Sequence, residues 1–191
     1  MSVLPIAHIG NPVLRERATE VDADALSSAE TQSFIDDLVE TMRAANGAGI
    51  AAPQVSRSVR ICVVEVQDNP RYPYKPNVPL TVMINPVIEP LTTDTFENYE
   101  GCLSVPNLRG VVDRFTRITL RYQTREGTSV ERDIAGLTAG TFQHELDHLD
   151  GVLFIDRVKD PRTLATWADF ERFHKAAFIE RIVPFIAKMG G

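Results

Sequence analysis

The sequence predicts an α+β fold, in which antiparallel strands occupy the middle of the chain and helices precede and follow them. The first sign is a helical hydrophobic repeat between residues 29 and 46. The second is strict alternation over Ile118–Tyr122, which is typical of a half-buried antiparallel strand. The third is a His-Glu-x-x-His motif in a further helical segment. Because the strands cluster, we expect central antiparallel sheets packed around that motif's helix, with N- and C-terminal helices.

The first helix is expected after Ser27, because Ser27 and Glu30 form a capping-box pattern. Apolar residues then recur at helical spacing: Phe34, Ile35, Leu38, Val39 and Met42. The helix should end near Asn46-Gly47, since glycine is favoured just past a C-cap.

Strands are expected next, at Val59–Val66, Leu80–Ile84 and Ile118–Tyr122. The turn around Gly127 predicts a hairpin whose return strand spans 129–134. Residues 68–79, rich in Pro, Asn and Tyr, are interpreted as a surface loop within one domain rather than a boundary.

Two helices should follow the strands. One spans about Thr138 to Asp150 and is stopped by Gly151. The other begins at Asp160-Pro161, an acidic N-cap followed by proline at the first helical position, and ends before Pro184.

Composition limits the function. The 191 residues suit one domain, expected to span 1–191, with 43% hydrophobic and 24% charged residues. A net charge of −6 argues against a nucleic-acid binder, whose phosphate contacts need a basic face. We expect no signal peptide, no membrane span, no disulfide framework from Cys62 and Cys102, and a cytoplasmic location. Cys62 sits in an apolar run and is interpreted as a buried core residue.

The chemistry is concentrated in residues 143–149. His144 and His148 are four residues apart, so on a helix they share a face and can bind one metal ion. Glu145 is placed to reach a water on that metal without being a ligand itself. Catalytic zinc-type sites usually have three protein ligands.

The residues alone leave the third ligand open. A downstream carboxylate, Asp156 or Glu171, would complete the ligand set of a metalloprotease. Cys102, in a polar segment beside Gly101, would instead supply a thiolate. Spacing does not decide between them, because both require the chain to return through space.

Three separated motifs give the chain a resemblance to the peptide deformylases, which covers it from about Pro5 to Phe154. They are Gly-Ala-Gly-Ile-Ala-Ala-Pro-Gln at 47–54, Glu-Gly-Cys-Leu-Ser at 100–104, and Gln-His-Glu-Leu-Asp-His-Leu at 143–149. The resemblance implies Cys102 as the third ligand beside His144 and His148. It also implies removal of the N-formyl group from the initiator methionine of nascent polypeptides, with release of formate.

The resemblance also assigns roles around the reaction. A metal-activated water would attack the formyl carbon, with Glu145 as general base and then general acid. The Gln54 amide and the backbone N–H of Leu103 would stabilise the oxyanion. Glycine lets the backbone approach a substrate and adopt conformations closed to other residues. The residues expected to bind substrate are Gly47, Gly49, Ile50, Arg109 and Glu100, the last also a candidate for orienting neighbouring groups.

The cofactor is expected to be one divalent metal ion. The resemblance implies Fe²⁺ in cells, and a His₂Cys ligand set would also accept Zn²⁺, Ni²⁺ or Co²⁺. The expected partners are N-formyl-methionyl nascent peptides and, transiently, the exit region of the ribosome.

The chain departs from familiar family sequences at Gly140 and Thr141, where larger apolar residues often line the methionine pocket, so a wider pocket is one expectation. Residues 162–191 are weakly covered by the resemblance. His8 and His174 have no partner pattern and are interpreted as structural or surface residues. Three alternatives remain: a metalloprotease, a non-catalytic metal-stabilised binding module, and a family member with a changed substrate.

Overall fold

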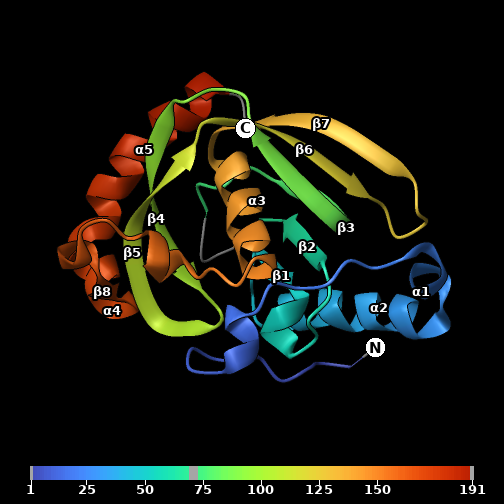
Figure 1. The fold of residues 1–191 in the computed structure, drawn as a ribbon. Coiled ribbons are helices and arrows are strands. Elements are labelled where there is room, and N and C mark those ends of the chain that lie inside the picture. Colours follow the sequence, from blue (N-terminus) through green and yellow to red (C-terminus); the bar gives the residue numbers. More distant parts are fainter. Residues whose placement is uncertain (1, 69–72, 190–191) are drawn as a thin grey trace.

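The computed structural model describes residues 2–68 and 73–189 and contains two antiparallel sheets with a long helix between them (Figure 1). The strands are β1 (Gly49–Ala51), β2 (Ile61–Val66), β3 (Val78–Pro90), β4 (Thr95–Cys102), β5 (Val105–Phe115), β6 (Arg117–Gln123), β7 (Ser129–Ala135) and β8 (Ala165–Thr166). The helices are α1 (Ala23–Ser27), α2 (Ala29–Ala44), α3 (Gly136–Leu149), α4 (Trp167–Asp169) and α5 (Lys175–Met189). Short 3-10 helices lie at Pro12–Arg15, Ala52–Val55, Phe154–Arg157 and Pro161–Thr163, and a π-helical turn at Phe170–His174.

The five-stranded sheet has the order β1-β2-β3-β6-β7, and the three-stranded sheet has the order β4-β5-β8. The helix that carries the His-Glu-x-x-His motif, α3, contacts β1, β2 and β3 on one side and β5 on the other. Figure 1 shows α2 beside β1 and β2, and α5 along the outer side of β4. The predicted α+β class, with antiparallel sheets around this helix and helices towards both ends, is confirmed.

The expected strands of the first sheet are present. The strand expected from Val59 begins at Ile61, and the one expected at Leu80–Ile84 extends over Val78–Pro90. The hairpin is confirmed as β6 and β7, in full antiparallel register, with Gly127 at φ +81° in its turn. Of the loop expected at 68–79, residues 69–72 lie outside the described residues, and β3 already begins at Val78.

The strands β4 and β5 were not predicted, although they pair over their whole length. They bury charged side chains: Glu100 on β4, and Arg109 and Arg114 on β5. These charges interrupt the apolar alternation by which a half-buried strand is recognised. The two strands that the sequence did not predict are therefore the ones whose buried side chains include charged residues.

Helix α2 is capped one residue later than predicted. Its N-cap is Ser28, whose hydroxyl accepts from the N–H of Thr31, whereas Ser27 ends the separate helix α1. At the other end Asn46, not Gly47, takes the left-handed conformation, with φ +51°. The N–H groups of Gly47 and Asn46 donate to the carbonyls of Met42 and Arg43, which is a Schellman motif.

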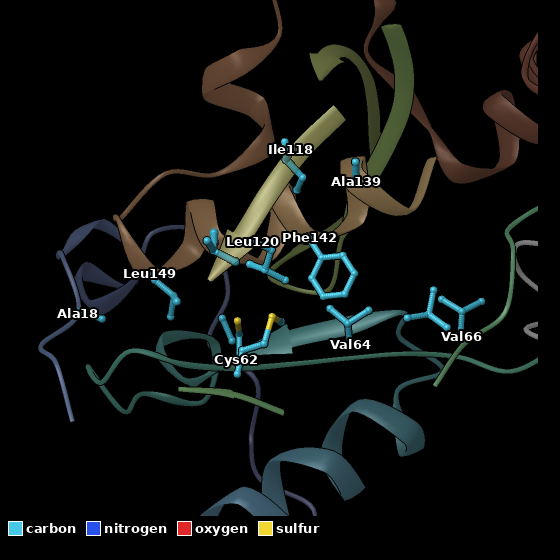
Figure 2. Close-up of a cluster of buried hydrophobic side chains, with 13 residues drawn as sticks. Ala18, Cys62, Val64, Val66, Ile118, Leu120, Ala139, Phe142 and Leu149 are labelled. Atoms are coloured by element: carbon cyan, nitrogen blue, oxygen red, sulfur yellow. The ribbon is translucent and has the colours of Figure 1, made fainter. Parts of the chain in front are cut away.

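Helix α3 is buried on almost every side, so it joins two hydrophobic clusters. In Figure 2 the ring of Phe142 points from α3 toward Val64 of β2, with Leu120 of β6 alongside. On the opposite side, Leu137 packs with aromatic residues of β4 and the C-terminal segment. The helix is thereby held in one rotation, and the direction of His144 and His148 is fixed.

The predicted third helix is wrong in both of its limits. Asp160 does cap a helical turn, but this turn is the 3-10 helix Pro161–Thr163, and the chain then pairs with β5 as β8. The helix α5 starts at Lys175 and continues through Pro184 to Met189. Its ring contacts with β4, such as Phe185 stacked on Phe96 at 4.6 Å, accompany this packing, so tertiary contacts outweigh the helix-breaking tendency of proline. No helix in the described part of the chain combines the length and apolar character that a membrane span requires.

Candidate metal centre and active-site cleft

Cys102, His144 and His148 come together at one point between the sheets. Two of them project from one face of α3, with ring centroids 5.1 Å apart, and Cys102 is the last residue of β4. One ligand atom from each of the three lies within 4.8 Å of the others. Such a group of two imidazoles and a thiol suits a divalent metal ion.

The hydrogen bonds indicate which ring nitrogen of each histidine faces the centre. Nδ1 of His144 lies 2.8 Å from Oε2 of Glu100, so its Nε2 is left for a metal. Nε2 of His148 lies 3.3 Å from Sγ of Cys102. Metal-binding histidines usually hold their second nitrogen on a carboxylate, as His144 does on Glu100, and this contact fixes the ring.

Glu100 belongs to a buried ion network behind the metal centre. Arg114 donates to both carboxylate oxygens of Glu100 at 2.8 Å and to Asp147 at 2.6 Å, while Arg157 pairs with Asp147 from the surface. Burial alone would raise the pKa of Glu100, but the charge and hydrogen bonds of Arg114, with that of His144, lower it well below its usual value. Glu100 therefore remains a carboxylate that orients His144, and its expected contact with substrate stays a prediction.

Glu145 points into the same region from α3. It is 5% exposed, and its Oε2 has no hydrogen-bond partner within the described residues. Burial raises the pKa of Glu145 to about 7. A buried carboxylate oxygen without a protein partner is costly unless it meets water or an ion, so the site fits a metal-bound reaction centre.

Gly49 is needed for space rather than for an unusual backbone conformation. A Cβ at Gly49 would lie 2.5 Å from Oε1 of Glu145, closer than any real contact. Neither Gly47 nor Gly49 has a positive φ. The expectation that these glycines adopt conformations closed to other residues is therefore wrong. Their backbone conformations are open to any residue, and glycine is needed because a side chain would collide with its neighbours.

Gln54 and Ser104 frame the thiol. The Gln54 amide nitrogen donates to Oγ of Ser104 at 3.1 Å and lies 3.5 Å from Sγ of Cys102, while its oxygen accepts from the N–H of Ala51. The N-terminal segment ties the two elements together, because the N–H of Ala7 donates to the Gln54 carbonyl and that of Ile9 to the Ser104 carbonyl, both at 2.7 Å. The amide is thus held beside the metal centre.

A cleft of about 350 Å³ opens at this centre. Most of the residues singled out in the sequence line it: Gly47, Gly49, Gln54, Glu100, Cys102, Leu103, Arg109, His144 and Glu145. His148 is buried beneath it. Ile50 is fully buried in the hydrophobic cluster with α2, so its expected substrate contact is not available to its side chain.

Several cleft residues were missed or only partly anticipated from the sequence. Gly140 and Thr141 line the cleft, but a Cβ at Gly140 would lie 3.0 Å from Cζ of Phe96, so this ring fills the space expected to widen the pocket. The residues missed are Tyr74, Lys75, Asn98, Tyr99, Val105, Asn107, Leu108 and Trp167, whereas Ala48 and Gly101 stand within the quoted motifs without an assigned role. Most lie on or beside the unpredicted strands, so only recognition of β4 and β5 would have found them.

Arg109 is buried rather than solvated. It is 2% exposed, its guanidinium donates to the Tyr99 carbonyl, and its Cζ lies 4.7 Å and 4.4 Å from the ring centroids of Trp167 and Phe170. The side chain is held rigidly at the cleft wall by this stacking.

The structure does not place either carboxylate alternative for the third ligand in a group with the two histidines. Asp156 accepts from the N–H of Leu153 and pairs with Arg15, and Glu171 pairs with Lys175 on the C-terminal segment. Neither belongs to a group of ligand-type side chains with the two histidines among the described residues. The structure therefore removes the observation on which a metalloprotease would depend.

The remaining histidines and the other cysteine lie where the sequence suggested. His8 and His174 are exposed, and His174 stands 5.8 Å from the ring of Tyr99. Cys62 is fully buried in the core of Figure 2.

Comparison with known proteins agrees with this geometry. Residues 3–163 match the family model described as polypeptide deformylase. The chain is 45% identical over 169 residues to peptide deformylase 2 of Nostoc sp., an alignment that covers 88% of this chain and 93% of that protein.

Solved structures with the same fold include the Met-Ala-Ser-bound class I type b peptide deformylase of Acinetobacter baumannii, with 42% identity and a TM-score of 0.80 over 83% of this chain and 100% of that one. The peptide deformylase of Thermotoga maritima is 36% identical, with a TM-score of 0.74 over 84% of this chain and 100% of that one.

Proposed function

The chain belongs to the peptide deformylase family, and from this premise we propose that Cys102, His144 and His148 hold the metal ion of a deformylation site. The family consists of metal-dependent hydrolases that remove the N-formyl group from the N-terminal methionine of new polypeptides. The observation that carries the proposal is that a cysteine and two histidines meet beside the buried carboxylate of Glu145, whose Oε2 has no hydrogen-bond partner in the described part of the chain.

Cys102, His144 and His148 would hold a divalent ion, because catalytic metal sites usually combine three protein ligands with water or substrate. When bound, such an ion acts as a Lewis acid that acidifies water and polarises a carbonyl group. The ion is proposed to be Fe²⁺ in the cell, with Zn²⁺, Ni²⁺ or Co²⁺ as other ions that these ligands accept.

Glu145 is proposed as the proton-transfer residue. Its raised pKa, about 7, lets it take a proton from water and return it to the departing amine near neutral pH. Its position against Gly49, with Oε2 unpartnered, keeps the carboxylate directed into the cleft.

Gln54 and Leu103 are proposed to stabilise the oxyanion. The Gln54 amide nitrogen stands beside Cys102, anchored through its oxygen to Ala51, so it can donate without first being ordered. Leu103 follows the ligand directly and lines the cleft, so its backbone N–H is the second proposed donor. Removing one such donor typically costs about 3 kcal/mol of transition-state stabilisation.

Substrate binding is proposed to use the cleft walls at Gly47, Gly49 and Arg109, all of which line it. Glu100 is proposed chiefly to position His144, because Arg114 and His144 occupy its carboxylate. Ile50, whose side chain is buried, is proposed to contribute only through its backbone.

The natural substrates are proposed to be formylated nascent chains met in the cytoplasm near the exit region of the ribosome. This follows from the family's reaction, since the formyl group is carried by newly made polypeptides. Residues 1–191 are proposed to act as one domain, because both sheets contribute to a single cleft.

The test uses Glu145→Gln on the metal-loaded protein, with formate release from a formyl-Met peptide as the assay. We expect unchanged metal content and a loss of kcat of at least about 100-fold, the lower end for general acid–base catalysis. A variant that keeps near-normal turnover would show that Glu145 is not the proton-transfer group. Wild-type protein without formate release would contradict the function itself.

A further inference from the structure

Trp167 forms part of the cleft wall although it comes from the C-terminal segment. It is the first residue of α4, directly after β8, and its half-buried side chain lines the same cleft as Cys102 and Glu145. It lies beyond residues 3–163, the part of the chain that matches the family model. It therefore lies in the C-terminal segment, outside the stretch that the family model describes.

The backbone around Trp167 is fixed by three contacts. β8 pairs with β5 through Leu108↔Thr166 and Arg109↔Ala165. The side chain of Asn107 accepts from the N–H of Trp167 at 3.2 Å. Asn107 itself has φ +57°, a left-handed conformation that asparagine tolerates better than most residues. The ring is thus presented by an ordered edge of the sheet rather than by a loose loop.

The Trp167 side chain is also fixed, through its contact with Arg109. The guanidinium carbon lies over both the Trp167 ring and the Phe170 ring, 4.7 Å and 4.4 Å from their centroids, and the guanidinium donates to the Tyr99 carbonyl. Arg109 and Trp167 both line the cleft, so together they form one rigid surface with an aromatic and a cationic part.

This surface lies at a distance that suits a peptide. In the order β4-β5-β8, the metal ligand Cys102 ends β4 and Trp167 follows β8. Two strand spacings of roughly 4.8 Å separate these edges by about 10 Å, the length of about three extended residues. A cleft of about 350 Å³ also has room for more than the formyl group and one side chain.

We propose that Trp167, stacked on Arg109, is a specificity-determining residue that binds the second or third residue of the substrate and favours an apolar or aromatic side chain there. The proposal rests on the proposed function. A peptide that reaches the Trp167 ring gains contact area that formylmethionine alone does not reach, so the effect should appear only with longer substrates.

The kinetic test compares two substrates, formyl-Met amide and formyl-Met-Ala-Phe amide, on the metal-loaded enzyme. For Trp167→Ala we expect kcat/KM to fall about tenfold on the tripeptide, mostly through KM, and less than about twofold on formyl-Met amide. Trp167→Phe should keep most of the tripeptide activity, because a smaller ring can still stack on Arg109. Phe173→Ala, a change at a 61% exposed ring of the same segment, is the matched control and should leave kcat/KM unchanged on both substrates. An equal loss on both substrates, or no loss on the tripeptide, would overturn the proposal.

A second measurement needs no turnover. Trp167 is the only tryptophan of the chain, so its fluorescence reports on this surface alone. Titrating unformylated Met-Ala-Phe amide into the metal-loaded protein should give a saturable change in emission, and methionine amide should give none. Deformylation without a peptide-dependent emission change would overturn the subsite and leave the proposed function standing. An emission change with Met-Ala-Phe amide in a protein that releases no formate would support the subsite and contradict the proposed function.

Discussion

Oε1 of Glu145 lies 2.5 Å from the position that a Cβ of Gly49 would occupy. The first residue of β1 and the proposed proton-transfer carboxylate of α3 therefore share a space that only glycine leaves open. Cδ and Cγ of Glu145 lie nearly as close, at 2.6 Å and 2.7 Å, so rotation of the carboxylate alone would not relieve the collision.

Gly49→Ala should therefore displace Glu145 and lower kcat/KM about 100-fold, the loss typical of a displacement near 1 Å. The metal content should be unchanged, because the collision involves no ligand. Formate release and metal analysis check this. Gly47→Ala is the milder comparison, since its Cβ would meet the movable end of Leu103 at 3.0 Å and the Gly49 carbonyl at 3.2 Å, and its loss should stay below tenfold. Equal losses in the two variants would contradict the argument.

How much of this site could be expected from the sequence depends on which residues carry it. His144 and His148 are four residues apart on one helix, with Glu145 next to the first, and local spacing alone brings the three together. Cys102 reaches them only through β4, a strand whose buried charges hide it from a hydrophobic pattern. Its assignment as the third ligand needed the resemblance, and the structure brings its sulfur into the group.

The elements of the fold likewise separate into those that local sequence patterns predict and those that depend on tertiary contacts. The apolar strand β2 and the alternating hairpin of β6 and β7 follow from the period of their side chains. The C-terminal segment does not, because a helix that continues through Pro184 and a two-residue strand at Ala165–Thr166 are held by contacts with β4 and β5. That short strand positions Trp167 in the cleft, and no local sequence pattern predicts it.

Cys102→Ala should remove the bound metal and the activity together, since two histidines rarely hold a catalytic ion alone. Asp156→Asn is the matched comparison, because Asp156 is the carboxylate that could have replaced the cysteine. Asp156 pairs with Arg15 and accepts from the N–H of Leu153, so this variant should keep its metal and lose no more than about 1 kcal/mol of stability. Metal analysis of both proteins decides the third ligand. Loss of metal in Asp156→Asn with retention in Cys102→Ala would overturn our assignment.

Glu100→Gln tests the network behind His144. The change leaves the buried guanidinium of Arg114 with Asp147 as its remaining carboxylate, and an amide orients His144 less strongly. Breaking a buried pair typically costs about 3–5 kcal/mol, and losing a carboxylate behind a metal-binding histidine lowers metal affinity about 10–100-fold. Urea unfolding and chelator competition measure the two effects. Arg157→Gln, at a 45% exposed partner of Asp147, should cost less than about 1 kcal/mol, and a comparable cost would contradict the role of burial.

Gly151→Ala separates stability from catalysis at the end of α3. Gly151 has φ +72°, and a Cβ there would lie 2.7 Å from the carbonyl of Arg15, so both the backbone conformation and the packing oppose a side chain. The N-terminal segment is held at this point, where the N–H of Ala18 donates to the Leu149 carbonyl.

Strain in the left-handed region and overpacking each cost about 1–3 kcal/mol, so we expect the free energy of unfolding to fall by about 2–4 kcal/mol. Gly151 donates only to the backbone carbonyl of His148, and the proposed ligand side chains project from α3 before this turn or from β4. The metal content and the kcat of the folded fraction should therefore stay within about twofold of wild type. Denaturant unfolding and formate release give the two quantities independently. A large loss of kcat without loss of stability would mean that the end of α3 acts on His148 directly, rather than anchoring the N-terminal segment to the fold.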